Sequence, residues 1–322
     1  MRSVQVQSLD GPAGVRVVEV PEPVRGPDEV LVEVHALGVS WPDLLLSRGQ
    51  YQVKPEPPFQ LGVDFAGVVR EAPEGSGFGP GDRVACVLPY GGGADVVAVH
   101  PEGVFPLPDG VSFEKAAALP MNYLTAQFAL ATRAQLRKSE TVLVHGAAGG
   151  VGTATLQVAK GLGARTVGVV STPEKADFVR ELGADHAVLV DGFLGAVREA
   201  TGGRGVDVVV DVVGGDLMTD SLRALAPLGR VLVVGFTAGA IPEVRVNRLL
   251  LNNIDVRGVG WGAYAMARPG FMRSQWDALV PMLGSGVVDP PIGATYPLEE
   301  MGRALTEMEQ RAVLGKTVLT LR

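Results

Sequence analysis

The stretch Thr141–Lys175, TVLVHGAAGGVGTATLQVAKGLGARTVGVVSTPEK, sets the architecture of this chain. Residues 142–144 form an apolar run that ends in a cluster of glycines, which is typical of a strand buried on both faces. Apolar residues then recur at helical spacing from Val151 to Leu162, and a second apolar strand follows at 166–170. The order strand, glycine turn, helix, strand predicts one βαβ unit of a doubly wound parallel sheet.

The glycine turn predicts a binding site for the phosphates of a dinucleotide. A phosphate needs backbone N–H groups that point at it with no side chain in the way, and a helix N-terminus adds a partial positive charge. The usual spacing G-x-G-x-x-G appears here at Ala147, Gly149 and Gly152, so alanine replaces the first glycine. Alanine fits there only if the turn needs no positive φ at residue 147. The alternative is a structural turn without a ligand.

The end of the second strand indicates which nucleotide binds. A site for NAD usually has Asp or Glu at this point, to bind the ribose 2′-hydroxyl. This chain has Ser171, Thr172 and then Lys175, and hydroxyls with an ammonium group suit a 2′-phosphate. We therefore expect NADPH to be preferred over NADH. The same residues are also a plausible cap for the next helix, and both roles are compatible.

Composition bounds the class of protein. The chain has 322 residues, 47% of them hydrophobic and 20% charged, which suggests two domains with substantial cores. A formal net charge of −7 disfavours nucleic-acid binding. A single cysteine, Cys86, excludes an intrachain disulfide and suggests a reducing compartment. With no apolar signal core and no apolar run of membrane-spanning length, we expect a soluble cytoplasmic protein with no membrane partner.

Three parts follow one another along the chain. Residues 1–121 contain short alternating strands separated by Pro and Gly turns, which predicts a compact β-rich domain. Residues 122–260 show a regular alternation of strands and helices, which predicts the nucleotide-binding sheet. Residues 261–322 predict two helices and a final strand, too little for a core of their own, so we expect them to return to the first domain.

Several motifs carry a resemblance to a known family. They are Gly62–Val69 (GVDFAGVV), Gly81–Val84 (GDRV), Asn122–Ala126 (NYLTA), His145–Gly152 (HGAAGGVG) and Gly315–Leu319 (GKTVL). Over essentially its whole length the chain resembles the medium-chain dehydrogenases/reductases, in the zinc-free quinone oxidoreductase (zeta-crystallin-like) branch. The resemblance implies an α/β fold, in which a Rossmann doubly wound parallel sheet is inserted in a β-rich GroES-like catalytic domain.

The resemblance also bears on zinc. Zinc-dependent relatives have a cysteine where Ser40 stands, a His-Glu pair where Val63 and Asp64 stand, and a lobe with four close cysteines. Here one cysteine remains, and the four histidines show no ligand spacing. We predict no bound metal. Without a Lewis acid, the hydride must go to an acceptor that is already electrophilic, such as a quinone or an activated alkene.

The resemblance implies a cleft between the two domains, with candidate catalytic residues Ser40, Asp43 and Tyr51. Ser40 stands where the family often has asparagine, and Leu45 stands where some members have a second tyrosine. Tyr51 is either a substrate contact or a packing residue. Asp64 also matches a family position, and a purely structural role is equally open.

The cofactor contacts that the resemblance implies lie at Thr125, Gly150, Val151, Ser171, Lys175, Phe236 and Arg311, beside the Gly149 and Gly152 of the turn. Arg311 is alternatively a solvated cation at a helix end. Asp191, which follows the third strand, would repel a 2′-phosphate if its side chain faced the nucleotide.

These expectations combine into a leading hypothesis and two alternatives. The leading hypothesis is an NADPH-dependent quinone oxidoreductase. The first alternative is a reductase of α,β-unsaturated carbonyls or enoyl thioesters, which is less favoured because no His or Lys stands out as a proton donor. The second alternative is a non-catalytic NADPH-binding protein with a structural or regulatory role. The apolar segment Asn253–Gly260 predicts an exposed edge strand, and we expect a homodimer formed through it.

Overall fold

The structure, a computed structural model, describes all residues 1–322, and its contacts divide the chain into two compact units. Unit 1 comprises Met1–Asn122, Arg268–Asp277 and Pro290–Arg322. Unit 2 comprises Tyr123–Ala267 and Ala278–Asp289. The stretch that follows residue 261 therefore contributes to both units.

Unit 2 is built on a six-stranded parallel sheet with the strand order β11-β10-β9-β12-β13-β14. Its strands are β9 (Thr141–His145), β10 (Arg165–Val170), β11 (His186–Leu189), β12 (Val206–Asp211), β13 (Leu225–Val233) and β14 (Asp255–Gly258). The direction of winding reverses between β9 and β12, and dinucleotides bind at this kind of switch point, beyond the carboxyl ends of the strands. The doubly wound parallel sheet predicted from the sequence is confirmed.

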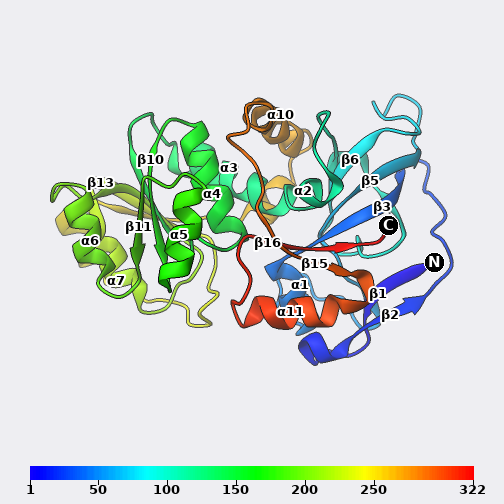
Figure 1. Ribbon diagram of the computed structural model, residues 1–322, viewed down its shortest axis with the longest axis horizontal. Helices are drawn as coiled ribbons and strands as arrows, with labels where there is room; N and C mark the ends of the chain where they lie inside the picture. The colour runs from blue at the N-terminus through cyan, green and yellow to red at the C-terminus, as the bar shows by residue number, and fades with distance from the viewer. The chain divides into compact units, whose positions relative to one another are not determined.

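Helices connect these strands and cover the sheet. They are α3 (Thr125–Gln127), α4 (Gly150–Gly161), α5 (Pro173–Glu181), α6 (Phe193–Ala200), α7 (Leu217–Ala224), α8 (Asn247–Asn252) and α9 (Trp261–Ala265). The chain enters unit 2 through π-helical turns η3 (Pro120–Leu124) and η4 (Phe128–Ala134). In Figure 1, α4 and α5 lie on one side of β10 and β11, and α6 and α7 lie together on the other side. Because apolar helices shield them, the central strands β9 and β12 are buried along their whole length.

Unit 1 is β-rich. A three-stranded sheet joins β2 (Val15–Glu19), β1 (Arg2–Val6) and β4 (Phe59–Gln60). A seven-stranded sheet has the order β15-β16-β3-β5-β6-β8, with β7 also paired to β3. Its strands are β3 (Val30–Val39), β5 (Asp64–Glu71), β6 (Arg83–Val87), β7 (Val96–Val99), β8 (Val104–Pro106), β15 (Ile292–Pro297) and β16 (Lys316–Thr320). The antiparallel pairing of β16 with β3 brings the end of the chain into this sheet.

The helices outside the nucleotide-binding alternation are short, apart from α10 and α11. They are η1 (Gly11–Gly14), α1 (Trp41–Ser47), η2 (Pro101–Gly103), α2 (Phe113–Ala117), α10 (Phe271–Gly284), η5 (Leu298–Glu300) and α11 (Met301–Glu309). Helix α1 has Pro42 in its first turn, where a missing N–H costs nothing. Strand β15 was not predicted, because the short segment IGATYP between two helices has the length of a connecting loop.

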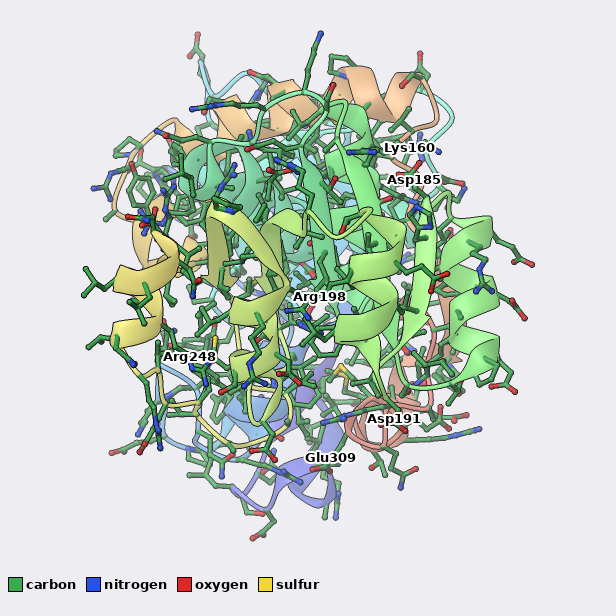
Figure 2. All side chains as sticks on the ribbon, turned by 90° about the vertical axis from the view of Figure 1, so that its left-hand side faces the viewer. Lys160, Asp185, Asp191, Arg198, Arg248 and Glu309 are labelled. Carbon is green, nitrogen blue, oxygen red and sulfur yellow. The ribbon has the colours of Figure 1, made fainter.

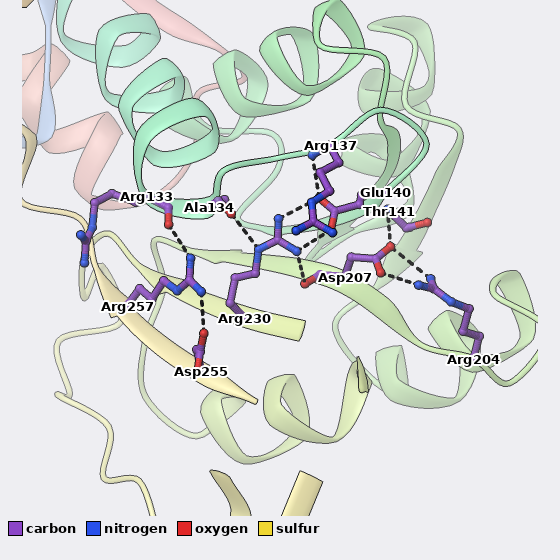
Figure 3. A network of polar contacts seen from close by, with 10 residues as sticks. All are labelled: Arg133, Ala134, Arg137, Glu140, Thr141, Arg204, Asp207, Arg230, Asp255 and Arg257. Atoms are coloured by element: carbon purple, nitrogen blue, oxygen red, sulfur yellow. Dashed lines mark hydrogen bonds and ion pairs between the residues drawn. The ribbon is translucent and has the colours of Figure 1, made fainter. Parts of the chain in front are cut away.

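A network of ion pairs holds the amino-terminal edge of the unit 2 sheet together (Figure 3). The buried Arg230 of β13 donates from Nη1 and Nη2 to the Glu140 carboxylate, both at 2.7 Å, and from Nε to the carbonyl oxygen of Ala134 at 3.0 Å. Asp207 in turn accepts from the backbone N–H of Thr141 and from Arg204. The network caps the last turn of η4 and fixes the start of β9 beside β12 and β13.

Candidate active site

The glycine turn of unit 2 has the backbone geometry of a phosphate site. Gly146, directly after β9, adopts φ +65°. Ala147 does not have a positive φ, so alanine is tolerated at residue 147. A Cβ on Gly152 would lie 2.2 Å from the carbonyl oxygen of Gly146, so only glycine allows α4 to start this close to β9. Gly149 precedes the helix as its N-cap, and Gly150 and Val151 form its first turn.

The open side of this turn is a cradle that a side chain would fill. The Cβ position of Gly149 has one neighbour within 4 Å, the carbonyl oxygen of Gly146 at 3.5 Å, and its φ is −88°. Glycine is therefore not required at residue 149 by the fold itself. The space in front of the N–H groups at the start of α4 is free for an anion, which helix N-termini bind through these groups.

Ser171 and Lys175 lie together at the carboxyl end of β10. Lys175 Nζ donates a hydrogen bond to Ser171 Oγ at 3.3 Å. Ser171 is exposed and Lys175 is half-buried. Thr172 caps α5 by accepting from the backbone N–H of Lys175. Both of the roles considered from the sequence are thus compatible with the geometry. Asp191, beyond β11, is exposed at the molecular surface (Figure 2).

The other expected cofactor residues are distributed over both units. Thr125 is buried at the start of α3, which packs against α4 in unit 2. Phe236 follows β13 with 38% of its surface exposed, and its ring fills the space beside Gly214. Arg311 belongs to unit 1, on the exposed turn after α11, where it adopts φ +57°.

Unit 1 contains a buried polar cluster at the start of α1. Ser40 Oγ donates to Asp64 Oδ2 at 2.9 Å, and Lys316 Nζ donates to Ser40 Oγ at 2.5 Å and to Asp64 Oδ2 at 2.7 Å. The backbone N–H groups of Ser40 and Gly62 both donate to the Asp43 carboxylate. None of the four side chains is more than 4% exposed. The structure therefore brings together Ser40 and Asp43, and joins them to Asp64 and Lys316.

Burial changes the protonation equilibria in this cluster. Loss of water raises the pKa of Asp43 to about 7, against the lowering effect of its backbone hydrogen bonds and of Lys316. Burial likewise raises the pKa of Tyr51, and the charges of Asp43 and Asp64 raise it further. Tyr51 thus lies within the electrostatic reach of the two carboxylates, and its phenol stays protonated at neutral pH.

The cluster does not suit zinc. Residue 40 offers a hydroxyl, and the only cation within hydrogen-bond distance of Ser40 and Asp64 is the Lys316 ammonium, which would repel a metal ion. Nowhere does the structure gather three His, Cys, Asp or Glu side chains in an arrangement able to hold a metal ion. The cradle of unit 2, by contrast, fits a dinucleotide.

Lys316 is the site residue that reasoning from the sequence missed. The segment Lys316–Leu321 predicts a strand, and a lysine at its first position is ordinarily solvated. Its side chain is 4% exposed instead, because Gly38 of β3 leaves room for it. Reasoning from the sequence pointed to no lysine beside Ser40, whereas the structure places Lys316 there. The only sequence signal was the Gly315–Lys316 pair within a family motif.

A second buried polar group lies at the switch point of the sheet. His145 ends β9 and its Nε2 lies 2.8 Å from Ser221 Oγ, which in turn donates to the carbonyl oxygen of Leu217. Asp211 ends β12 and accepts from the backbone N–H groups of Val213 and Gly214. Burial lowers the pKa of His145 to about 4, although the Asp211 charge opposes this. His145 is therefore neutral at physiological pH.

Fold and cradle together define a dinucleotide-binding α/β oxidoreductase scaffold, and the comparisons with known proteins agree. Residues 26–109 match the family model of the alcohol dehydrogenase GroES-like domain, and residues 150–283 match that of zinc-binding dehydrogenases. The bovine quinone oxidoreductase-like protein 2 is 39% identical over 94% of this chain and 87% of its own length. The chain belongs to the quinone oxidoreductase branch of the medium-chain dehydrogenase/reductase family.

Solved structures show the same fold over the whole chain. A probable oxidoreductase from Mycobacterium abscessus is 45% identical, with a TM-score of 0.92 over 100% of this chain and 99% of its own. The quinone oxidoreductase from Thermus thermophilus, solved alone and in complex with NADPH, is 34% identical with a TM-score of 0.86 over 100% of both chains. No helix in the chain is long and apolar enough to span a membrane.

Proposed function

We propose that this protein transfers a hydride from NADPH to a quinone without the help of zinc. The observation that carries the proposal is the cradle at the start of α4, where Gly152 permits close packing on Gly146 and Gly149 leaves the helix N-terminus open. That arrangement binds the diphosphate of a dinucleotide. When bound, NADPH supplies the hydride, and the protein's part is to hold it, exclude water and place the acceptor.

The preference for NADPH is supported by the end of β10. Ser171 and Lys175 place a hydroxyl and an ammonium group where an NAD-specific site would have a carboxylate. Asp191 is exposed to solvent, which screens its charge. The Thermus thermophilus relative was crystallised with NADPH, which is consistent with this assignment. We assign Thr125, Phe236 and Arg311 to further contacts with the cofactor.

Unit 1 supplies the residues proposed to meet the acceptor. Ser40 offers a hydroxyl, Tyr51 a protonated phenol, and Asp43 holds the start of α1 in place through the N–H of Ser40. The Lys316 ammonium beside Ser40 supports turnover without zinc, because it disfavours a dication at this point. We also propose the functional division 1–121 and 261–322 for catalysis and 122–260 for NADPH.

The test is a steady-state assay of NADPH oxidation with 1,2-naphthoquinone, run on metal-free protein after elemental analysis. We expect turnover with quinone, no stoichiometric zinc, and no loss of activity after chelation. Activity that depends on zinc, or NADPH binding without oxidation across a panel of acceptors, would contradict the proposal. The second result would favour a non-catalytic, regulatory role.

A second candidate function is the reduction of α,β-unsaturated carbonyls or enoyl thioesters. The observation that favours it is Lys316, because alkene reduction benefits from a placed proton source and the structure provides a buried ammonium next to Ser40. Turnover of a 2-alkenal or crotonyl thioester that exceeds that of 1,2-naphthoquinone would establish this alternative.

We further propose a homodimer joined through β14. This strand forms the edge of the six-stranded sheet, and an unpaired edge invites pairing with a second copy. The neighbouring Leu250 and Leu251 of α8 are 77% and 74% exposed, which suits burial in an interface. Analytical ultracentrifugation should give the mass of a dimer, and L250E/L251E should give a monomer. A wild-type monomer at micromolar concentration would contradict the proposal.

A further inference from the structure

The contacts of Lys316 are unusual for a lysine at the first position of a strand. Its Nζ donates to Ser40 Oγ at 2.5 Å and to Asp64 Oδ2 at 2.7 Å, over sequence separations of 276 and 252 residues. Asp64 Oδ1 accepts from the backbone N–H of Met121 at 2.8 Å, so the carboxylate is held from both sides. These hydrogen bonds fix the position of the Lys316 ammonium group and direct one of its N–H groups at Ser40 Oγ.

Gly38 of β3 leaves space beside the Lys316 side chain. A Cβ on Gly38 would lie 2.8 Å from Lys316 Cε and 2.1 Å from the carbonyl oxygen of Ala117. Glycine at residue 38 therefore allows the backbone of Ala117 and the side chain of Lys316 to approach β3 at the same point. Burying an ammonium group costs free energy unless it is paired, and a packed apolar residue would serve stability as well. The cluster therefore suggests a role in the reaction.

The hydroxyl of Ser40 lies between a hydrogen-bond donor, Lys316, and an acceptor, Asp64. Its oxygen accepts a hydrogen bond from Lys316 and its O–H donates one to Asp64, so the hydroxyl can pass its own proton to a stronger acceptor while a second proton stands ready to replace it. An oxygen of a quinone or enone becomes such an acceptor when a hydride reaches its conjugated system. Ser40 alone is a weak acid, and it needs a source that replaces the proton in the same step.

We propose that Lys316 is a positioning residue that restores the proton of Ser40 during reduction of the acceptor. The inference rests on the proposed function. The acceptor gains a hydride from NADPH, and the Ser40 O–H bond breaks as its proton moves to the acceptor oxygen. One Lys316 N–H bond breaks as that proton moves to Ser40 Oγ, which leaves a neutral amine. The amine takes a proton from solvent after product release, so each turnover consumes one NADPH and one proton.

The experiment compares two acceptors in wild-type protein and in K316M, which keeps the length of the side chain and removes the ammonium group. The first acceptor is 1,2-naphthoquinone, whose reduction needs a proton. The second is the 10-methylacridinium cation, a flat hydride acceptor whose product is neutral without one. We expect K316M to lower kcat with the quinone about 100-fold, the low end of general acid catalysis, and to change kcat with acridinium less than about threefold.

A solvent deuterium isotope effect on kcat with the quinone gives a second readout, which a merely structural role would not move. We expect it to be larger in K316M than in the wild type, because protonation then limits the rate. K316M leaves the buried Asp64 carboxylate without a counter-ion, so K316M/D64N provides a variant that removes both charges and should show the same selectivity. K138M, which removes an exposed ammonium group, is the matched control and should behave as the wild type.

The outcomes separate the inference from the proposed function. Equal losses with both acceptors and an unchanged isotope effect would show that Lys316 only supports the fold, and would overturn the inference alone. Undiminished quinone turnover in K316M would do the same. A wild-type protein that reduces neither acceptor would overturn the proposed function, and the inference with it.

Discussion

Gly152 lies so close to Gly146 that a Cβ on Gly152 would be 2.2 Å from the carbonyl oxygen of Gly146. This contact joins the first turn of α4 to the end of β9. We expect G152A to push the helix away from the strand, destabilising the protein by about 1–3 kcal/mol as overpacked sites do. NADPH affinity should fall at least tenfold, measured by fluorescence titration beside a thermal denaturation curve.

The matched variant is G149A, which separates the fold from the ligand. Residue 149 has φ −88° and its Cβ would meet no atom nearer than 3.5 Å, so the stability should change by no more than about 1 kcal/mol. Its methyl group nevertheless enters the space in front of the helix N-terminus. Wild-type affinity for NADPH in G149A would show that the diphosphate binds elsewhere.

The pair Ser171–Lys175 should set the preference between the two nicotinamide cofactors. Replacing Lys175 by alanine removes the ammonium group while Thr172 still caps α5. Because a charge-assisted hydrogen bond contributes about 1.5–3 kcal/mol, the ratio of kcat/KM for NADPH to that for NADH should fall roughly tenfold to a hundredfold. S171D should lower it further. An unchanged ratio in K175A would remove this lysine from the site, and K160A, on an exposed lysine of α4, serves as control.

His145 should make the stability of the protein depend on pH. Its folded-state pKa of about 4 lies below the ordinary value of 6.5. Between these two pH values, His145 is protonated in the unfolded chain and neutral in the folded one. The stabilising contribution is complete above pH 6.5 and is lost as the pH falls toward 4. Between pH 7.5 and 5 the loss is about 2 kcal/mol, since one pKa unit corresponds to about 1.4 kcal/mol.

The measurement for His145 compares urea unfolding of wild type and H145N at both pH values. The variant cannot titrate at residue 145, so its stability should fall by about 2 kcal/mol less than that of the wild type over the same range. Identical pH dependence would mean that the imidazole of the folded protein titrates normally.

Arg230 should be the most costly arginine of unit 2 to remove. Its side chain is 7% exposed and donates hydrogen bonds to the Glu140 carboxylate and to the carbonyl oxygen of Ala134 (Figure 3). The R230M variant would remove the guanidinium donor from both groups. Breaking a buried pair in this way costs about 3–5 kcal/mol. Arg204, 56% exposed in its pair with Asp207, is the control and should cost less than about 1 kcal/mol. Scanning calorimetry of both variants measures the difference.

Much of the nucleotide-binding unit could be predicted because its signals are local. The run 142–144, the glycines up to Gly152 and the helical spacing up to Leu162 lie within one continuous stretch, and the central strands of the sheet are apolar along most of their length. The ends of the strands are harder to predict, as at β13, which begins at Leu225, before its apolar run 231–234. Such ends depend on pairing with neighbours, which no local pattern specifies.

The buried cluster of unit 1 was predictable only in part. Ser40, Asp43 and Asp64 were expected from the family resemblance, but their hydrogen bonds and the raised pKa of Asp43 follow from the tertiary structure. The solvent exposure of a carboxylate, which sets its pKa, depends on the tertiary structure and cannot be read from the sequence.

The order of residues alone was enough to predict a parallel sheet with a phosphate-binding turn, because hydrophobic periodicity and glycine spacing act over short distances along the backbone. The same sequence carried the motifs that resemble those of the quinone oxidoreductases. The position of Lys316 against Ser40 and Asp64, in contrast, came from the folded molecule. That contact arises when β16 pairs with β3 and Gly38 leaves space for the lysine. A contact between residues 276 positions apart depends on the packing of the whole sheet.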